Sequence, residues 1–152
     1  MLNRVLLLIA ILFLSACDLG DSDSGAMVEP TLPGTNVPAS FAGTYTGTLD
    51  VTAEALGVSE SDSFDITITV TDDAMVRFEG DDPDEVFVVG LANDGTFAGN
   101  LQIQEDECSG SLATTGQVDG TTASGDVTGS GQCRVSGINV DVTLNGSFSA
   151  SR

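Results

Sequence analysis

Apolar and polar residues alternate through most of the chain after residue 40. The clearest segments, which carry apolar residues on one parity, are 41–51, 64–70, 97–103 and 138–148. Shorter apolar segments lie at 75–78 and 85–91, and polar, Gly-rich ones at 108–114, 117–121 and 124–129. Because a period of two is typical of a strand with one buried face, these segments predict β-strands. Residues 53–58 have a helical tendency but are too few to form a helix on their own.

Glycine recurs on the apolar parity within these segments. The repeated unit, an apolar residue followed at two-residue steps by glycine and a second apolar residue, occurs as Phe41-Ala-Gly-Thr-Tyr45, Tyr45-Thr-Gly-Thr-Leu49, Phe97-Ala-Gly-Asn-Leu101 and Leu144-Asn-Gly-Ser-Phe148. An inward glycine lets a strand coil and leaves room for a neighbouring ring. We therefore expect an all-β fold, an antiparallel up-and-down meander of about eight strands that closes into a small barrel. A β-sandwich or an open roll would fit the same pattern.

The N-terminal region has a different character. Val5 to Leu14 form an unbroken apolar run whose ten residues would span about 15 Å as a helix, half of the roughly 30 Å hydrocarbon core, which indicates a signal peptide. The next residues, Leu14-Ser15-Ala16-Cys17, resemble the lipobox of bacterial lipoproteins. This resemblance implies cleavage after Ala16 and a diacylglyceryl group on the sulfur of Cys17. The alternative is a soluble secreted protein with an ordinary cleavage site near Cys17.

These features divide the chain into three parts. Residues 1–16 are expected to be the signal peptide, 17–38 a lipidated cysteine with a flexible acidic, Pro-rich tether, and 39–152 the β-domain. The resemblance places the protein in the bacterial cell envelope, on the outer membrane or on the periplasmic face of the inner membrane. Asp18 resembles the inner-membrane retention signal of enteric bacteria.

Two cysteines, Cys108 and Cys133, remain after the lipobox. In an exported domain such a pair predicts one disulfide, here closing a Gly-rich loop. A metal site built on two thiols is the alternative, although the chain has no His to complete it.

The charge is strongly negative. Without the signal peptide the chain has Arg77, Arg134 and Arg152 against 23 carboxylates, a net charge of −20, and no Lys. Such a field excludes nucleic acid as a main partner. The carboxylates are interpreted either as a solvated surface suited to saline surroundings or as Ca²⁺ ligands.

The candidate Ca²⁺ ligands lie in the segments that flank the short strand at 75–78. They are Asp72, Asp73, Glu79, Asp81, Asp82, Asp84 and Glu85. The alternative is that these residues form polar turns that discourage association at the edge of the sheet. We expect no other cofactor.

The first strand carries a further resemblance. With Gly43-Thr-Tyr45 it is similar to small β-barrel domains of bacterial lipoproteins and, more loosely, to the lipocalins, whose Gly-x-Trp signature it echoes. Eight-stranded barrels can hold a small apolar ligand, although the inward Phe, Ile, Val and Leu residues are about enough to fill a small barrel.

The residue types argue against catalysis. The chain has no His, and no Lys or spare thiol remains after the lipobox, so the usual nucleophile–base pairs and Schiff-base chemistry are absent. We therefore expect a non-enzymatic, lipid-anchored envelope protein that acts as a structural or protein-interaction module. The alternatives are a binding protein for a small apolar ligand and a Ca²⁺-binding surface domain.

Overall fold

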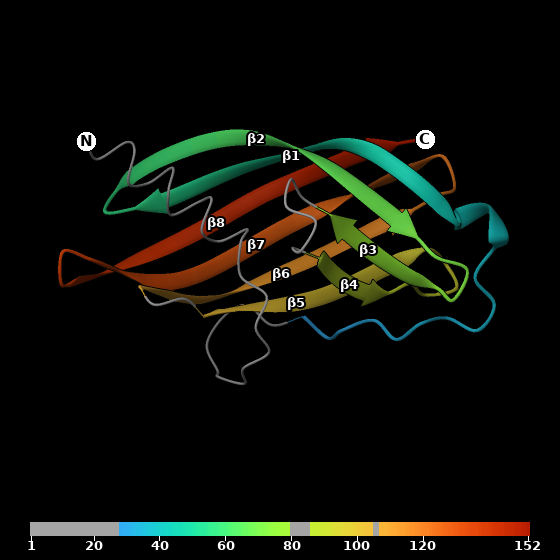
Figure 1. Ribbon diagram of the computed structural model, residues 1–152, viewed down its shortest axis with the longest axis horizontal. Coiled ribbons are helices and arrows are strands. Elements are labelled where there is room, and N and C mark those ends of the chain that lie inside the picture. Colours follow the sequence, from blue (N-terminus) through green and yellow to red (C-terminus); the bar gives the residue numbers. More distant parts are fainter. Residues whose placement is uncertain (1–27, 80–85, 105–106) are drawn as a thin grey trace.

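The computed structural model describes residues 28–79, 86–104 and 107–152, and these form almost entirely β-structure (Figure 1). A short 3-10 helix, η1 (Ala39–Phe41), precedes the strands. The eight strands are β1 (Gly43–Ala55), β2 (Val58–Val70), β3 (Met75–Glu79), β4 (Val86–Gly90), β5 (Thr96–Gln104), β6 (Cys108–Val118), β7 (Thr122–Val135) and β8 (Ile138–Ser151). Within the described residues, no helix is long and apolar enough to cross a membrane.

The strands form one antiparallel sheet in the order β4-β3-β2-β1-β8-β7-β6-β5. The first and last strands are joined, because Leu49 of β1 lies opposite Phe148 of β8. The predicted eight-stranded meander is therefore confirmed, and the sheet is nearly closed into a barrel. Its two ends are β4 and β5, between which the described residues form no ladder of pairs. We call this position the seam.

The segment 28–37 lies along the seam. The N–H of Thr31 donates to the carbonyl of Ala98 in β5 (2.9 Å), and the N–H of Gly34 donates to Leu91 just after β4 (2.7 Å). Gly90 is required here, because a Cβ on it would come within 2.3 Å of the carbonyl oxygen of Thr31.

This contact changes the expected domain boundary. The sequence analysis assigned residues 17–38 to a flexible tether, whereas 28–37 are held on the sheet by hydrogen bonds to β5 and to the β4–β5 connection. The folded part therefore begins about ten residues before the expected position 39. Residues 17–27 lie outside the described part of the chain.

The interior has two apolar clusters. The larger lies where β3 and β4 complete the barrel, and Phe78, Phe97 and Phe148 pack within it. The smaller surrounds Cys108 and Cys133, toward the other end of β6 and β7. Because β3 and β4 have five residues each against 13 in β2, they cover only part of its length (Figure 1).

Inward glycines make room for rings, both at Gly99 of the repeated unit, where a Cβ would lie 3.0 Å from the ring of Phe87, and at two glycines outside it. Gly116 and Gly125 lie opposite each other on β6 and β7. A Cβ on Gly116 would lie 2.4 Å from the ring of Phe97, and one on Gly125 2.6 Å from the ring of Phe148. The two rings are stacked with their centroids 6.1 Å apart.

Two of the predicted segments are now defined more closely. Residues 53–58, which were too few to predict a helix, lie in the first hairpin: β1 continues to Ala55, and Leu56 and Gly57 form a two-residue turn into β2. The polar segments at 108–114 and 124–129, together with residues 117 and 118, are parts of the two long strands β6 and β7, whereas residues 119–121 form the turn between them and are not strand as predicted. Pairing with β5 and β8 supplies the backbone hydrogen bonds that the weakly apolar sequence does not predict.

Candidate functional site

The predicted disulfide is present. Cys108 and Cys133 lie directly opposite each other in the β6–β7 register, with their Cα atoms 4.1 Å apart. Both side chains are buried, and Ile103, Val140 and Val142 lie in the same cluster. A disulfide in such surroundings is a structural element that fastens the Gly-rich part of the sheet.

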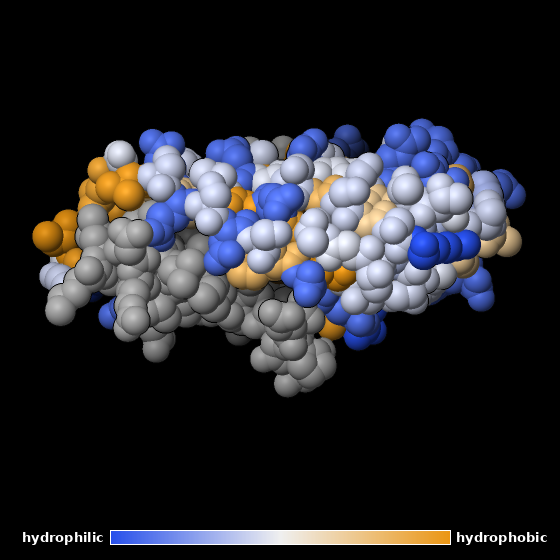
Figure 2. Space-filling model, turned by 90° about the horizontal axis from the view of Figure 1, so that it is seen from above, coloured by the Kyte–Doolittle hydropathy of each residue, from blue (hydrophilic) through white to orange (hydrophobic). Residues whose placement is uncertain are grey.

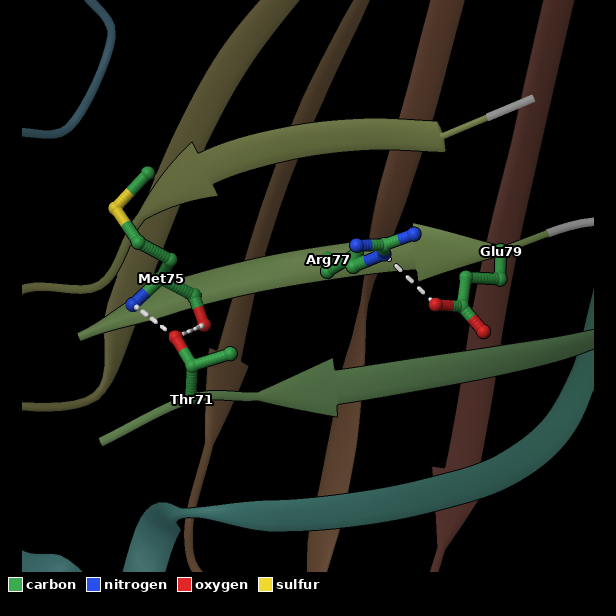
Figure 3. A network of polar contacts seen from close by, with 4 residues as sticks. All are labelled: Thr71, Met75, Arg77 and Glu79. Carbon is green, nitrogen blue, oxygen red and sulfur yellow. Dashed lines mark hydrogen bonds and ion pairs between the residues drawn. The ribbon is translucent and has the colours of Figure 1, made fainter. Parts of the chain in front are cut away.

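The acidic residues near β3 are separated in space. Asp72 and Asp73 lie in the β2–β3 turn, and Glu79 lies at the other end of β3. At the turn, the Thr71 hydroxyl lies 3.3 Å from the N–H of Met75, which donates to it (Figure 3). Thr71 also donates to the carboxylate of Asp73. These bonds tie the turn locally.

Glu79 already has a cationic partner. Its Oε1 atom lies 2.7 Å from Nε of Arg77, as the dashed line in Figure 3 shows. Across 28–79, 86–104 and 107–152 no three carboxylate or cysteine residues are grouped as metal ligands. Asp81, Asp82, Asp84 and Glu85 lie outside the described residues, so the Ca²⁺ site stays a prediction.

Carboxylates in two other turns act as local acceptors. Asp119, between β6 and β7, accepts from the backbone N–H groups of Thr122 (2.7 Å) and Thr121 (2.8 Å) and from both hydroxyls. These bonds hold the pKa of Asp119 well below its ordinary value of 3.8. The hydroxyl and N–H of Thr96 likewise lower the pKa of Asp94 in the β4–β5 turn.

The barrel interior is occupied by side chains. Phe78 is central to the ring cluster, with centroid distances of 5.9 Å to Phe87, 5.7 Å to Phe97 and 5.5 Å to Phe148. Aromatic pairs at such distances fill the interior and add favourable contacts. The described interior therefore has the character of a packed core rather than of a ligand chamber.

Tyr45, from the Gly43-Thr-Tyr45 sequence, closes one end of this core. Its ring is fully buried, and its hydroxyl donates to the carbonyl of Phe41 (2.7 Å). The guanidinium of Arg152 lies 4.9 Å from the ring centroid and donates to the Tyr45 hydroxyl (3.0 Å) and to the carbonyl of Ser40 (2.8 Å). The last residue of the chain thus fixes η1 and the start of β1 together.

The outer face of β1, β2 and β8 is rich in hydroxyl groups. Thr52 and Ser61 lie opposite each other, with their side-chain oxygens 2.8 Å apart. They line an open depression of about 760 Å³, together with Asp50, Val51, Asp62, Ser63, Asn145, Gly146 and Ser147. The depression presents hydroxyl, amide and carboxylate groups, and so suits hydrogen bonding to a polar partner.

Two groups of residues at the surface are not predicted by the sequence pattern. One is the contact between Asn100 and Val28: the N–H of Val28 donates to Oδ1 (3.0 Å), and the Asn100 amide donates to the Val28 carbonyl (2.6 Å). The other comprises Leu56 and Ile138, which are exposed at hairpin turns. A residue–Gly pair between two strands, such as Leu56-Gly57, is a turn signal that could have located the second group.

No family model, curated protein or solved structure matches the chain. The candidate site is consequently defined by geometry alone. It consists of the outer surface of a filled barrel and of the segment 28–37 that joins this barrel to the N-terminal region.

Proposed function

We propose that the protein is a lipid-anchored component of the bacterial cell envelope whose barrel acts as a structural or protein-interaction module without catalytic activity. The anchor would be a diacylglyceryl group on Cys17, as the resemblance of Leu14-Ser15-Ala16-Cys17 to the lipobox implies. The net charge of −20 in the mature chain disfavours nucleic acid and anionic lipid as partners.

The observation that carries this proposal is the packed interior. Tyr45, Ile68 and Phe97 are at most 2% exposed, and the stacked rings lie against the paired glycines. A barrel filled in this way offers its outside to partners. The hydroxyl-rich face of β1, β2 and β8 provides hydrogen-bonding groups beside apolar surface, a mixture that suits a protein partner.

The two alternatives have less support. A small apolar ligand would have to displace the ring cluster around Phe78, at the cost of its packing. A Ca²⁺ site would have to be built largely from the residues 80–85, because Glu79 is paired with Arg77 and Asp73 accepts from Thr71.

Cell fractionation tests the proposal. The full chain should sediment with membranes, and the Cys17→Ser variant should be recovered in the soluble fraction, because two or three acyl chains anchor a protein stably and none remain in the variant. The matched control is Cys108→Ser with Cys133→Ser, which removes the disulfide and leaves Cys17. Recovery of the full chain in the soluble fraction would contradict the anchor.

Chemical crosslinking on intact cells tests the interaction role. Crosslinked partners should be lost when Thr52 and Ser61 are replaced together by Arg, which puts two bulky positive charges on the outer face. They should be kept with Gln117→Arg on β6. Equal crosslinking by all three chains would contradict binding through the β1, β2 and β8 face.

A further inference from the structure

Exposed apolar side chains gather at one end of the barrel. Leu56 is 71% exposed in the β1–β2 turn, and Ile138 is 68% exposed beside the β7–β8 turn. Because β1 pairs with β8, the two turns lie at the same end, on the left in Figure 1, where Figure 2 shows hydrophobic surface. Val58 adds to this apolar end, while Leu32 and Val88, the other large apolar residues that are exposed in the described part of the chain, are near the seam.

Leu56 stabilises neither its turn nor the core. Its φ is +54° and that of Gly57 is +74°, so both residues of the turn have left-handed backbone conformations. In a two-residue hairpin turn of this kind Asn, Asp or Gly is favoured, and an L-residue with a longer side chain is strained. An exposed leucine at this position therefore adds backbone strain without adding to the core.

The segment 28–37 has its N-terminal residue directed toward the apolar end of the barrel. Val28 lies at Asn100, Thr31 at Ala98 and Gly34 at Leu91, so the segment runs antiparallel to β5. Its N-terminal side therefore points toward Gln104. Through the paired registers, Gln104 lies at the end of the barrel that carries the β7–β8 turn.

The distances allow an anchor on Cys17 and the apolar end to reach one surface. Val28 follows Cys17 by eleven residues, which span at most about 40 Å when fully extended. Asn100 is level with Thr128 in β7, and from there to Val135, at seven residues of about 3.4 Å, the strand extends about 24 Å. The reach of the chain exceeds this distance.

An arginine completes the apolar end. Arg77 is paired with Glu79, and Arg152 is bound to Tyr45 and Ser40, whereas Arg134 is exposed and forms no ion pair within the described residues. Arg134 lies opposite Asn139, next to the Val135–Ile138 pair. A guanidinium beside apolar side chains is suited to a phosphate group at the boundary between lipid headgroups and acyl chains.

We propose that this apolar end rests in the interfacial layer of the membrane, with Leu56 and Ile138 at the acyl boundary and Arg134 on the phosphate of a zwitterionic lipid. The inference rests on the proposed lipid anchor, because two or three side chains add to an anchor but do not replace it. A second copy of the chain is a less suitable occupant, since each copy carries a net charge of −20 and the turns protrude instead of forming a flat face.

Single tryptophans test the contact, because the chain has none. Lipidated full-length Ile138→Trp, reconstituted into phosphatidylcholine vesicles, should lose roughly half of its emission when the acyl chains are brominated, as expected for a side chain at the acyl boundary. Gln117→Trp, exposed near the opposite end of β6, is the control and should not be quenched. Leu56→Trp provides a second reporter with the same expectation.

The outcomes separate the two proposals. Mass spectrometry of the same preparation establishes the state of Cys17, and an unmodified thiol overturns both the anchor and the contact. A lipidated chain whose tryptophans at 56 and 138 are unquenched overturns the contact alone. Emission changes that follow protein concentration and not bromine would identify self-association and likewise overturn it.

Discussion

At the scale of single residues, Leu56 is a position where folding and function are expected to conflict. Replacing it with Asn should raise the free energy of unfolding by about 0.5–1 kcal/mol, because Asn tolerates the left-handed backbone better. Urea unfolding of the Cys17→Ser chain measures this. The matched control is Ser136→Asn at φ +53° in the β7–β8 turn, where the smaller change of residue type should give a smaller gain. A destabilised Leu56→Asn variant would contradict the account of the turn.

Asp119 is expected to make the stability of the folded state depend on pH. Its pKa is lowered by hydrogen bonds in the folded state, so the stability that it contributes is complete above its ordinary pKa of 3.8 and is lost as the pH falls below that value. Asp119→Asn should therefore be less stable than the parent chain at pH 7, and the difference should shrink below pH 3.8. Urea midpoints at several pH values measure both.

The control for this prediction is Asp126→Asn. Its carboxylate makes no side-chain hydrogen bond within the described residues, so the substitution should leave the midpoint at pH 7 almost unchanged. A constant difference between Asp119→Asn and the parent chain from pH 7 to pH 2 would show that the turn does not depend on the charge of Asp119.

At the scale of elements, the seam depends on the side-chain amide of Asn100. Asn100→Ala should release Val28 and raise the exchange rates of the Thr31 and Gly34 amides by up to roughly thirtyfold, because two hydrogen bonds of about 1 kcal/mol each are lost. Hydrogen exchange followed by NMR measures this. Asn145→Ala on β8 is the control and should leave these exchange rates unchanged. Unchanged rates in Asn100→Ala would show that the two hydrogen bonds between Asn100 and Val28 do not hold segment 28–37 on the sheet.

The disulfide is the second device at this scale. Reduction, or replacement of both cysteines by Ala, should cost about 3.5 kcal/mol in the chain-entropy model for a separation of 25 residues. Denaturant unfolding with and without reductant gives the value. Hydrogen exchange should show that, without the disulfide, the start of β6 and the end of β7 lose structure before the whole domain unfolds. A cost below about 1 kcal/mol in the free energy of unfolding would contradict this role.

The sequence predicts the strands better than their arrangement. The alternation in 41–51 and 138–148 is enough to predict β1 and β8, because a buried face leaves a period of two. It cannot predict the seam, because any two strands with one apolar face can pair. Val28 is bound by the side-chain amide of Asn100, which takes the place of a backbone partner. Such a contact leaves no periodic pattern of apolar residues in the sequence.

The same reasoning applies to the candidate site. The Cys108–Cys133 bond was predictable because one pairing remains once Cys17 is assigned to the expected lipobox. The acidic residues were not informative about geometry, since turns and metal sites use the same side chains. Arg134 became notable only after Arg77 and Arg152 were seen to have partners.

At the scale of the whole molecule, the net charge of −19, or −20 once the expected signal peptide is removed, should make stability depend on salt. Raising NaCl from 0.01 to 0.5 M should raise the melting temperature of the Cys17→Ser chain, because screening relieves repulsion among carboxylates. Choline chloride is the control and should act equally. A rise with millimolar CaCl₂ at constant ionic strength would instead support the Ca²⁺ alternative, and an absence of any salt effect would contradict the charged-surface account.

The central claim is that Cys17 joins this barrel to a membrane. Mass spectrometry of the N-terminal peptide of the protein purified from its host tests it most directly. The account predicts a chain that begins at Cys17 and carries a diacylglyceryl group on the sulfur, with or without an acylated amino terminus. A chain that begins elsewhere, or a Cys17 with an unmodified thiol, would contradict it.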